Sequence, residues 1–395
     1  MNHIYLDANA TTQIDEKVRD AMVAAYQCGD ANPASQHRPG QLARRKLENL
    51  RAEIASYMGA SRDDRLIFTS GGTESDNLAI IGLAGRLLPE NHEETPEVIV
   101  SAIEHPAVLG AADFLASQGF RIRRLPANKD GVVDLECLRE MISPATRLVS
   151  LMLGNNETGV IQDVRTAVDL CSELSIPVHC DAVQAIGKLA VSFTELGVDA
   201  MTVTAHKIHG PCGIGALLVS KRVELLPIMF GGTQQLGQRP GTEDLALATG
   251  FAKSIELACD NLDSRIAWIR TCRDRFEELI LQDFPDTLIH GRSVPRLPHT
   301  SNLSFTDGFG GYIDRQALMM AADHDQVAIS TGSACASGSS EPSHVLTAMG
   351  CPDDVVGGSI RASFSVQTTE MDVGLGARRI INCVKRLRQQ KSQRK

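Results

Sequence analysis

The sequence predicts an α/β fold, with a mostly parallel sheet between helices and a smaller α+β unit after it. Between about residues 40 and 225, short apolar segments alternate with helical segments, which is typical of such a sheet. A loop rich in glycine and glutamine, 231–241, then precedes a long helical stretch, 245–284. Beyond Pro285 the pattern changes to a shorter mixed unit that ends in a helix near 372–388.

The predicted strands are short apolar runs bounded by polar residues. They span residues 65–69, 97–102, 147–153, 176–180, 199–205 and 215–220. A segment of helical periodicity, 41–58, precedes the first of them. Short apolar strands separated by helices favour a parallel sheet that is buried on both faces. We predict a large domain, 15–260, and a small domain formed by 1–14 and 261–395 that carries a loop at about 328–343.

Composition excludes several classes of protein. The net charge of −9 argues against a general nucleic-acid binder, because such proteins are basic. No apolar run approaches the roughly 18 residues that a membrane span needs, and no secretory signal opens the chain, so we expect a cytoplasmic protein without a membrane segment. The 10 cysteines include no Cys-x-x-Cys pair, so we expect neither a metal site nor a disulfide framework.

Unusual polar residues follow the predicted strands where each strand ends, which is where ligands bind in open α/β sheets. After 65–69, the segment Ser70-Gly71-Gly72-Thr73 opens a helix. Free N–H groups, the helix dipole and the lack of side chains at the two glycines would suit a phosphate. A simple capped helix is the alternative.

Two further strand ends carry groups that suit an aromatic ligand. His105 follows 97–102, where a histidine can lie against a ring and shuttle protons, or be an ordinary polar loop residue. Asn155-Asn156 lies between Gly154 and Gly159, where the amides supply donors for a phenolate or carboxylate, or simply build a turn.

The last two strand ends carry a carboxylate and a lysine. Asp181 ends a buried strand, which is costly unless a partner such as a protonated pyridine nitrogen is present, and Gln184 on the same loop could reach a ring oxygen. Lys207 directly follows an apolar strand and suits Schiff-base chemistry if it is buried, although a single lysine more often extends to the surface. A pyridine that bears a phosphate and an aldehyde requires all five sites. We therefore predict pyridoxal phosphate as the cofactor.

Eight segments together carry a family resemblance: 4–12, 32–35, 69–77, 104–105, 155–159, 181–184, 205–207 and 239–243. They resemble the NifS/IscS type of cysteine desulfurase, in the class-V aminotransferase family. The likeness extends over nearly the whole chain. It implies the pyridoxal-phosphate fold type I, with a mostly parallel seven-stranded sheet, and a homodimer with active sites at the subunit boundary.

The resemblance also implies roles for individual residues. Lys207 would bind the cofactor covalently, His105 would stack on its ring, and Asp181 would contact the pyridine nitrogen. Gln184 would reach the phenolic oxygen. Phosphate contacts fall to Gly72, Thr73, Thr204 and His206, and to Thr242 of the partner subunit.

Cys335 narrows the expectation to sulfur chemistry. It lies among Gly, Ser and Ala residues that offer no apolar wall, so the composition predicts an exposed, mobile loop on which a thiolate can attack a substrate sulfur. An incidental loop cysteine is the alternative. The position resembles the family's nucleophile, and Arg361, helped by Asn156, resembles its substrate-carboxylate site. The expected reaction takes sulfur from L-cysteine, gives L-alanine and leaves a persulfide on Cys335 for an acceptor such as an iron–sulfur cluster scaffold.

Three features depart from the family pattern. Cys212 stands where relatives commonly carry lysine, and 231–238 differs from the usual Gly-Gly-Gly-Gln-Glu-Arg-Gly run. The basic tail 385–395 does not resemble the end that docks an iron–sulfur scaffold, and it is predicted to be a solvated, frayed end. The alternatives are a selenocysteine lyase or a desulfurase that serves another acceptor. An aminotransferase or an inactive protein of this fold is less consistent with Cys335 and Lys207.

Overall fold

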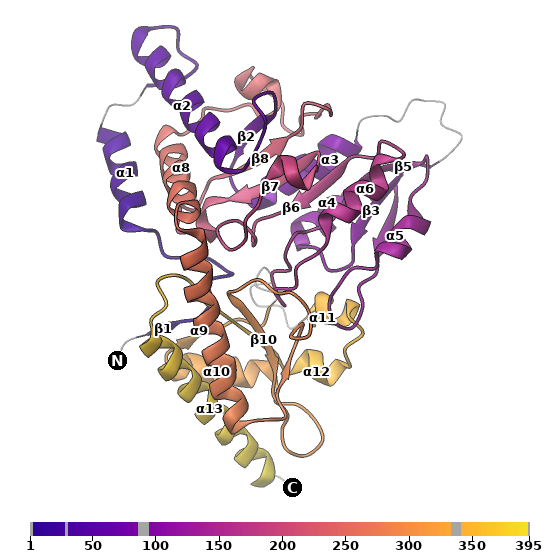
Figure 1. Ribbon diagram of the computed structural model, residues 1–395, viewed down its shortest axis with the longest axis vertical. Coiled ribbons are helices and arrows are strands. Elements are labelled where there is room, and N and C mark those ends of the chain that lie inside the picture. Colours follow the sequence, from indigo (N-terminus) through magenta and orange to yellow (C-terminus); the bar gives the residue numbers. More distant parts are fainter. Residues whose placement is uncertain (1–2, 28–30, 86–94, 333–340, 394–395) are drawn as a thin grey trace.

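A computed structural model describes residues 3–27, 31–85, 95–332 and 341–393 (Figure 1). Its main element is a seven-stranded sheet with the order β2-β8-β7-β6-β5-β3-β4. The strands are β2 (Arg65–Thr69), β3 (Glu97–Ser101), β4 (Arg121–Leu125), β5 (Thr146–Ser150), β6 (Val178–Asp181), β7 (Ala200–Thr204) and β8 (Gly215–Val219). Strands β4, β3, β5, β6 and β7 are parallel, and β8 runs antiparallel to both of its neighbours. The predicted mostly parallel sheet is confirmed.

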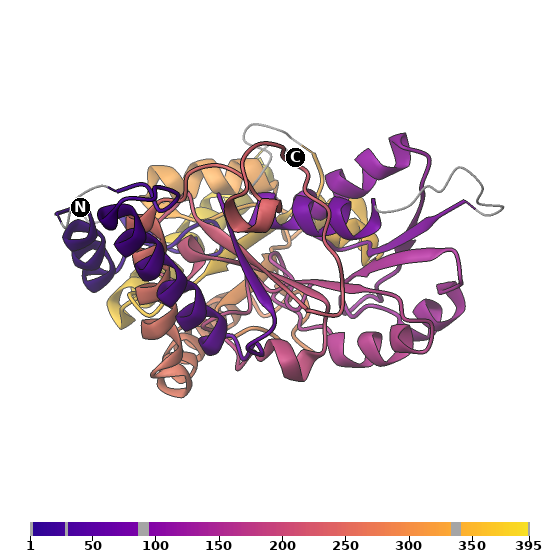
Figure 2. The ribbon, with the colours of Figure 1, turned by 90° about the horizontal axis from the view of Figure 1, so that it is seen from above.

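Helices cover both faces of this sheet (Figure 2). They are α2 (Arg38–Tyr57), α3 (Gly72–Ala84), α4 (Pro106–Ser117), α5 (Leu135–Met141), α6 (Val164–Ser172), α7 (Phe193–Leu196) and α8 (Leu245–Cys259). Successive strand residues point to opposite faces, so Ile67 packs in the core under α3 and α4, whereas Leu66 and Phe68 pack in the core under α2 and α8. This double burial explains the uniformly apolar strands.

Strand β4 is missing from the sequence prediction. Its sequence, Arg-Ile-Arg-Arg-Leu, contains three arginines, and it forms the outer edge of the sheet, where its arginine side chains remain at least partly exposed. An edge strand has one neighbour and tolerates charge, so it lacks the apolar run by which the other strands are recognised. The helical stretch 245–284 also divides, into α8 and α9 (Leu262–Asp283), at Asp260 and Asn261.

A second group of elements packs beside the large sheet. Its strands are β1 (Ile4–Tyr5), β9 (Leu288–Ile289), β10 (Thr300–Ser304), β11 (Val327–Ala328) and β12 (Ser359–Ser363). Its helices are α9, α10 (Arg315–His324), α11 (His344–Ala348), α12 (Asp353–Gly357) and α13 (Glu370–Gln393), and α1 (Glu16–Gln27) packs on α8. Strands β9, β10 and β12 form an antiparallel sheet, and β1 pairs with β11, so the N-terminal segment joins the C-terminal part.

The basic tail is not the frayed end that the sequence predicts. Helix α13 continues to Gln393, and its basic side chains pair with carboxylates of other elements. The pairs are Lys385–Asp283, Arg386–Asp325, Arg388–Asp286 and Lys391–Asp307. Because these acids come from distant segments, the sequence does not reveal them. Within the described ranges, no helix combines the length and apolarity that crossing a bilayer requires.

Candidate active site

A cavity of about 490 Å³ opens at the carboxyl ends of the parallel strands. The N-terminal segment, the loops that follow β2, β3, β5, β6 and β7, and the middle of β12 form its walls. Most of the predicted site residues line it: Gly72, Thr73, His105, Asn156, Asp181, Gln184, Thr204, His206, Lys207 and Arg361. The polar residues recognised separately at strand ends therefore converge in space.

The N-terminus of α3 forms one end of this cavity. Its cap residue, Gly71, provides no side-chain hydrogen bond, so among the described residues the first N–H groups of a 13-residue helix lack a side-chain cap. A Cβ at Gly72 would lie 3.1 Å from Val183 Cγ2, so glycine relieves a tight contact at this point. Backbone N–H groups at such a helix start, with the Thr73 hydroxyl beside them, suit a phosphate.

His105 is held as a neutral ring. Its Nδ1 accepts a hydrogen bond from Ala107 N at 3.2 Å, so the proton of the neutral ring lies on Nε2. Burial, together with the nearby charges of Lys207 and His344, lowers the pKa of His105 to about 4. An uncharged imidazole at pH 7 can lie against an aromatic ring without placing a second buried cation beside the lysine.

Asp181 is a buried carboxyl group at the end of β6. It accepts a hydrogen bond from Val183 N at 2.8 Å, and burial raises its pKa to about 6. Two further acids crowd the same region: burial and the charge of Asp181 raise the pKa of Glu104 to about 8 and that of Asp76 well above its ordinary value. A cationic N–H group placed here would stabilise the Asp181 carboxylate.

Lys207 lies in a short 3₁₀ turn, η1 (Ala205–Lys207), directly after β7. Its Nζ donates hydrogen bonds to the carbonyl oxygens of Asn9, at 2.5 Å, and Ala10, at 2.7 Å. The Gln184 amide donates to the same Asn9 carbonyl at 3.1 Å. The N-terminal segment thus holds the side chains of Lys207 and Gln184 at the wall of the cavity. Sequence reasoning assigned no role to Asn9, which appeared only inside a matching segment.

Arg361 is buried with part of its guanidinium already engaged. Nη2 pairs with Asp7 Oδ1 at 2.8 Å, and Nη1 donates to the carbonyl oxygens of Asn156, at 2.9 Å, and Gly332, at 3.2 Å. Arg361 Nε and Asn156 Oδ1 have no hydrogen-bond partner among the described residues. The Nε edge of the guanidinium, with the second hydrogen of Nη2, is therefore the side that a carboxylate could take in bidentate fashion.

Two predicted site residues are not among the described residues that line this cavity. Cys335 lies outside the described residues, although Glu341 and Pro342 beyond it line the cavity wall. Thr242 is exposed on the loop before α8, apart from the described residues that line the cavity of its own chain. Cys212 is also exposed, with its Sγ 4.0 Å from Thr11 Oγ1. The roles assigned to Cys335 and Thr242 stay predictions.

The residues of the cavity fit pyridoxal phosphate. The uncapped start of α3 suits its phosphate, and the buried Asp181 suits its protonated ring nitrogen. Lys207 supplies the amine for its aldehyde. Asp76 also lines this cavity, and its Oδ1 has no hydrogen-bond partner among the described residues. In the sequence it is one of two acids near the start of α3, with Glu74, and nothing local distinguishes it.

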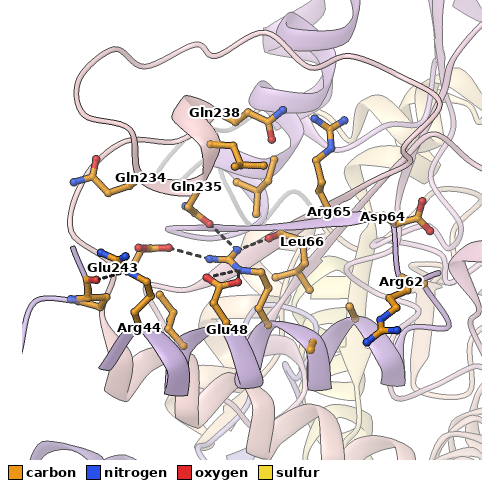
Figure 3. A pocket seen from close by; sticks show the side chains of 18 of the residues that line it. Arg44, Glu48, Arg62, Asp64, Arg65, Leu66, Gln234, Gln235, Gln238 and Glu243 are labelled. Atoms are coloured by element: carbon orange, nitrogen blue, oxygen red, sulfur yellow. Dashed lines mark hydrogen bonds and ion pairs between the residues drawn. The ribbon is translucent and has the colours of Figure 1, made fainter. Parts of the chain in front are cut away.

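A larger cavity, of about 950 Å³, lies between α2, β2 and the loop that contains η2 (Gln234–Gly237) (Figure 3). Here the Gln235 amide accepts from Phe68 N at 2.7 Å and donates to Phe68 O at 2.9 Å, so it caps the free edge of β2. Arg51 donates to Gln235 at 3.0 Å and pairs with Glu243 at 2.9 Å. A glutamate at position 235 could not both donate and accept as a carboxylate. Gln235, at which the loop departs from the family pattern, therefore makes both hydrogen bonds to the free edge of β2.

Comparison with known proteins agrees with this site. Residues 4–375 match the model of the family "Aminotransferase class-V". The chain is 39% identical to a cysteine desulfurase of Enterobacter agglomerans, over 98% of this chain and 94% of the relative. It is 38% identical to the cysteine desulfurase IscS of Dictyoglomus turgidum, over 94% of this chain and 91% of the relative. The solved structure of a NifS-like protein from Rickettsia africae superposes with a TM-score of 0.86 at 29% identity, covering 97% of this chain and 100% of that chain. The family uses pyridoxal phosphate. The chain belongs to the class-V aminotransferase family and, within it, to the cysteine desulfurases of the NifS and IscS type.

Proposed function

We propose that this protein is a cysteine desulfurase that binds pyridoxal phosphate through Lys207 and passes the sulfur of L-cysteine to Cys335. One observation carries the proposal: Lys207, Asp181, His105 and Arg361 line the same cavity, although they are far apart in the sequence. Pyridoxal phosphate bound there supplies an electron-withdrawing ring that makes the Cα proton of an amino acid easier to remove.

The residues of the chain have separate tasks in this proposal. Arg361 holds the substrate carboxylate through its Nε edge, while Asp7 fixes the opposite side of the guanidinium. Lys207 Nζ takes the Cα proton, because it is the amine that lines the cavity. Asp181, as a carboxylate, holds the proton of the ring nitrogen, and the neutral His105 covers the ring face.

The sulfur step needs no external oxidant or reductant. The Cys335 thiolate attacks the substrate sulfur, an S–S bond forms, and the C–S bond of the substrate breaks. The substrate Cβ takes up a proton and becomes the methyl group of L-alanine, Cα regains the proton that Lys207 removed, and Cys335 keeps the sulfur as a persulfide. We propose a thiol-bearing protein such as an iron–sulfur cluster scaffold as the acceptor, on the strength of the NifS and IscS likeness.

Product analysis tests the proposed reaction. With L-cysteine and a reducing thiol, we expect L-alanine and sulfide in equal amounts, with no requirement for an added keto acid. Formation of alanine only from selenocysteine would instead identify a selenocysteine lyase. Amino transfer that depends on a keto acid would overturn the proposal in favour of an aminotransferase.

We propose that the protein is a homodimer whose second copy covers the loop before α8. Phe230 is 86% exposed and Leu236 is 82% exposed on this loop, which a monomer in water would not favour. Thr242, on the same loop, is exposed and is not among the described residues that line the cavity of its own chain, which leaves it available to the cavity of the partner. The proposed domain division is supported by a separate core around Phe276 and Phe364, although α11 packs against the core of the large sheet.

Charged substitutions test the dimer. We expect the double variant Phe230→Asp, Leu236→Asp to sediment as a monomer and to retain less cofactor, because the proposed contact from Thr242 is lost with the interface. Met320→Asp is the matched control, since Met320 is 75% exposed on α10 and should leave the sedimentation coefficient unchanged. A double variant that remains dimeric would contradict this surface assignment.

A further inference from the structure

Glu157 is a buried carboxyl group that the proposed reaction does not use. It follows Asn156 in the loop after β5 and is 1% exposed. Its Oε2 accepts a hydrogen bond from Ser343 Oγ at 2.5 Å, while Oε1 has no hydrogen-bond partner among the described residues. Burying a carboxyl group is costly unless hydrogen bonds or nearby charges compensate for the lost water. The contacts that Glu157 makes therefore indicate its structural role.

One contact is with the residue that precedes the segment 333–340. Gly332 has a φ of 90°, and a Cβ built on it would lie 2.7 Å from Glu157 Oε2. The positive φ and the close approach both require glycine. The Gly332 carbonyl is in turn held by Arg361 Nη1 at 3.2 Å, and its N–H lies 3.3 Å from Ser330 Oγ.

The other contact is with the residues that follow the same segment. Ser343 is the N-cap of α11, and its Oγ accepts from Leu346 N at 3.1 Å while donating to Glu157. His344, the first residue of α11, bonds through Nε2 to the Glu104 carbonyl at 2.8 Å and lines the active-site cavity. Glu157 Oε2 therefore lies close to Gly332, which precedes the segment 333–340, and to Ser343, which follows it. This segment contains Cys335.

Glu157 is also tied to the proposed substrate arginine. The carbonyl of Asn156, its direct neighbour, accepts from Arg361 Nη1 at 2.9 Å. The Glu157 carbonyl accepts from Asn302 Nδ2 at 3.3 Å, and Asn302 pairs with Arg361 across β10 and β12. Glu157, Gly332, Ser343 and Arg361 thus form one hydrogen-bonded unit that is almost entirely buried.

We propose that Glu157 is a positioning residue, which holds Gly332 and Ser343 at a fixed distance from Arg361. Gly332 and Ser343 lie on either side of the segment 333–340, which contains Cys335, so we expect their placement to affect the rate at which Cys335 takes the substrate sulfur. This inference rests on the proposed function. Glu157 lines the active-site cavity, but its side-chain hydrogen bond goes to Ser343 and its close approach is to Gly332. The inference therefore predicts that Glu157 contributes to the sulfur-transfer step more than to the binding of cysteine.

The test compares Glu157→Ala, which removes the acceptor, with Ser343→Ala, which removes the donor, in the cofactor-loaded enzyme. Misplacing a nucleophile by about 1 Å costs up to about a hundredfold in rate, so we expect persulfide formation on Cys335 in a single turnover to slow at least about tenfold in each variant. The Kd for L-cysteine, followed by the absorbance change of the cofactor, should change by less than about twofold. The double variant should be no slower than the slower single variant, because both lose the same contact.

Asp314→Ala controls for the loss of a helix cap. Asp314 caps α10 by accepting from Ala317 N at 2.8 Å, and this variant should keep the wild-type rate of persulfide formation. Wild-type rates in both Glu157→Ala and Ser343→Ala would overturn the inference, as would a rise in Kd that accounts for the whole loss. A Cys335→Ser sample assayed in parallel separates the two proposals: normal sulfide release by that sample rejects the proposed function itself.

Discussion

Cys335→Ser is expected to release no sulfide from L-cysteine, while it keeps the visible absorbance of the bound cofactor. A serine hydroxyl is not ionised near neutral pH, and its oxygen cannot carry the sulfur as a persulfide. The residues proposed to bind the cofactor lie on other segments of the chain, so we expect cofactor binding to be unaffected. Sulfide release and absorbance are measured on the same samples, and mass spectrometry of the wild-type Cys335 peptide after exposure to L-cysteine should reveal one added sulfur atom.

Cys212→Ser is the matched control for this prediction. Cys212 is an exposed thiol near the N-terminal wall of the cavity, with its Sγ 4.0 Å from Thr11 Oγ1, but it is not among the residues that line the cavity. We expect this variant to desulfurate cysteine at the wild-type rate. Sulfur found on the Cys212 peptide, or undiminished turnover in Cys335→Ser, would show that the sulfur takes another route.

The strand ends explain why much of the site could be predicted from the sequence. The loops that follow β2, β3, β5, β6 and β7 lead to one cavity, so polar residues that follow separate apolar runs had to meet. His105, Asp181 and Lys207 were recognisable for this reason. Each is a polar residue placed where a buried strand stops, and this signal is local in the sequence.

The remaining contacts depend on segments that are distant in the chain. Arg361 pairs with Asp7, 354 positions away, and their contact arises only when β1 and β12 are brought together. Asn9, which accepts from Lys207, and Glu157, which touches Gly332, have no local pattern that separates them from ordinary loop residues. Distant partners also explain two failures of the sequence prediction. Strand β4 was missed because its pairing with β3, and not an apolar run, makes it a strand. The tail was predicted to be frayed because the carboxylates that pair with its basic residues are distant in the sequence.

Lys207→Ala is expected to remove both covalent cofactor binding and turnover. Loss of the amine leaves nothing in the cavity to bond to the cofactor aldehyde or to take the Cα proton, so activity should fall at least about a thousandfold. Borohydride reduction of the wild-type protein, followed by peptide mapping, should place the cofactor mass on the Lys207 peptide. The same treatment of Lys207→Ala should leave that peptide unmodified.

A second buried lysine, Lys188, allows a test of whether position in the cavity or a lowered pKa decides which lysine binds the cofactor. Burial, with the charges of Lys207 and Arg265, lowers the pKa of Lys188 to about 7, so Lys188 has a neutral amine available near physiological pH. Lys188 nevertheless points its Nζ at the Lys207 carbonyl, 3.1 Å away, and it does not line the cavity among the described residues. If access to the cavity decides which lysine reacts, the reduced cofactor should still be found on Lys207 in the variant Lys188→Met. This should hold even if loss of the hydrogen bond from Lys188 to the Lys207 carbonyl weakens cofactor binding. A cofactor mass found on Lys188 in the wild-type protein would show that a lowered pKa outweighs position, and the assignment of Lys207 would fail with it.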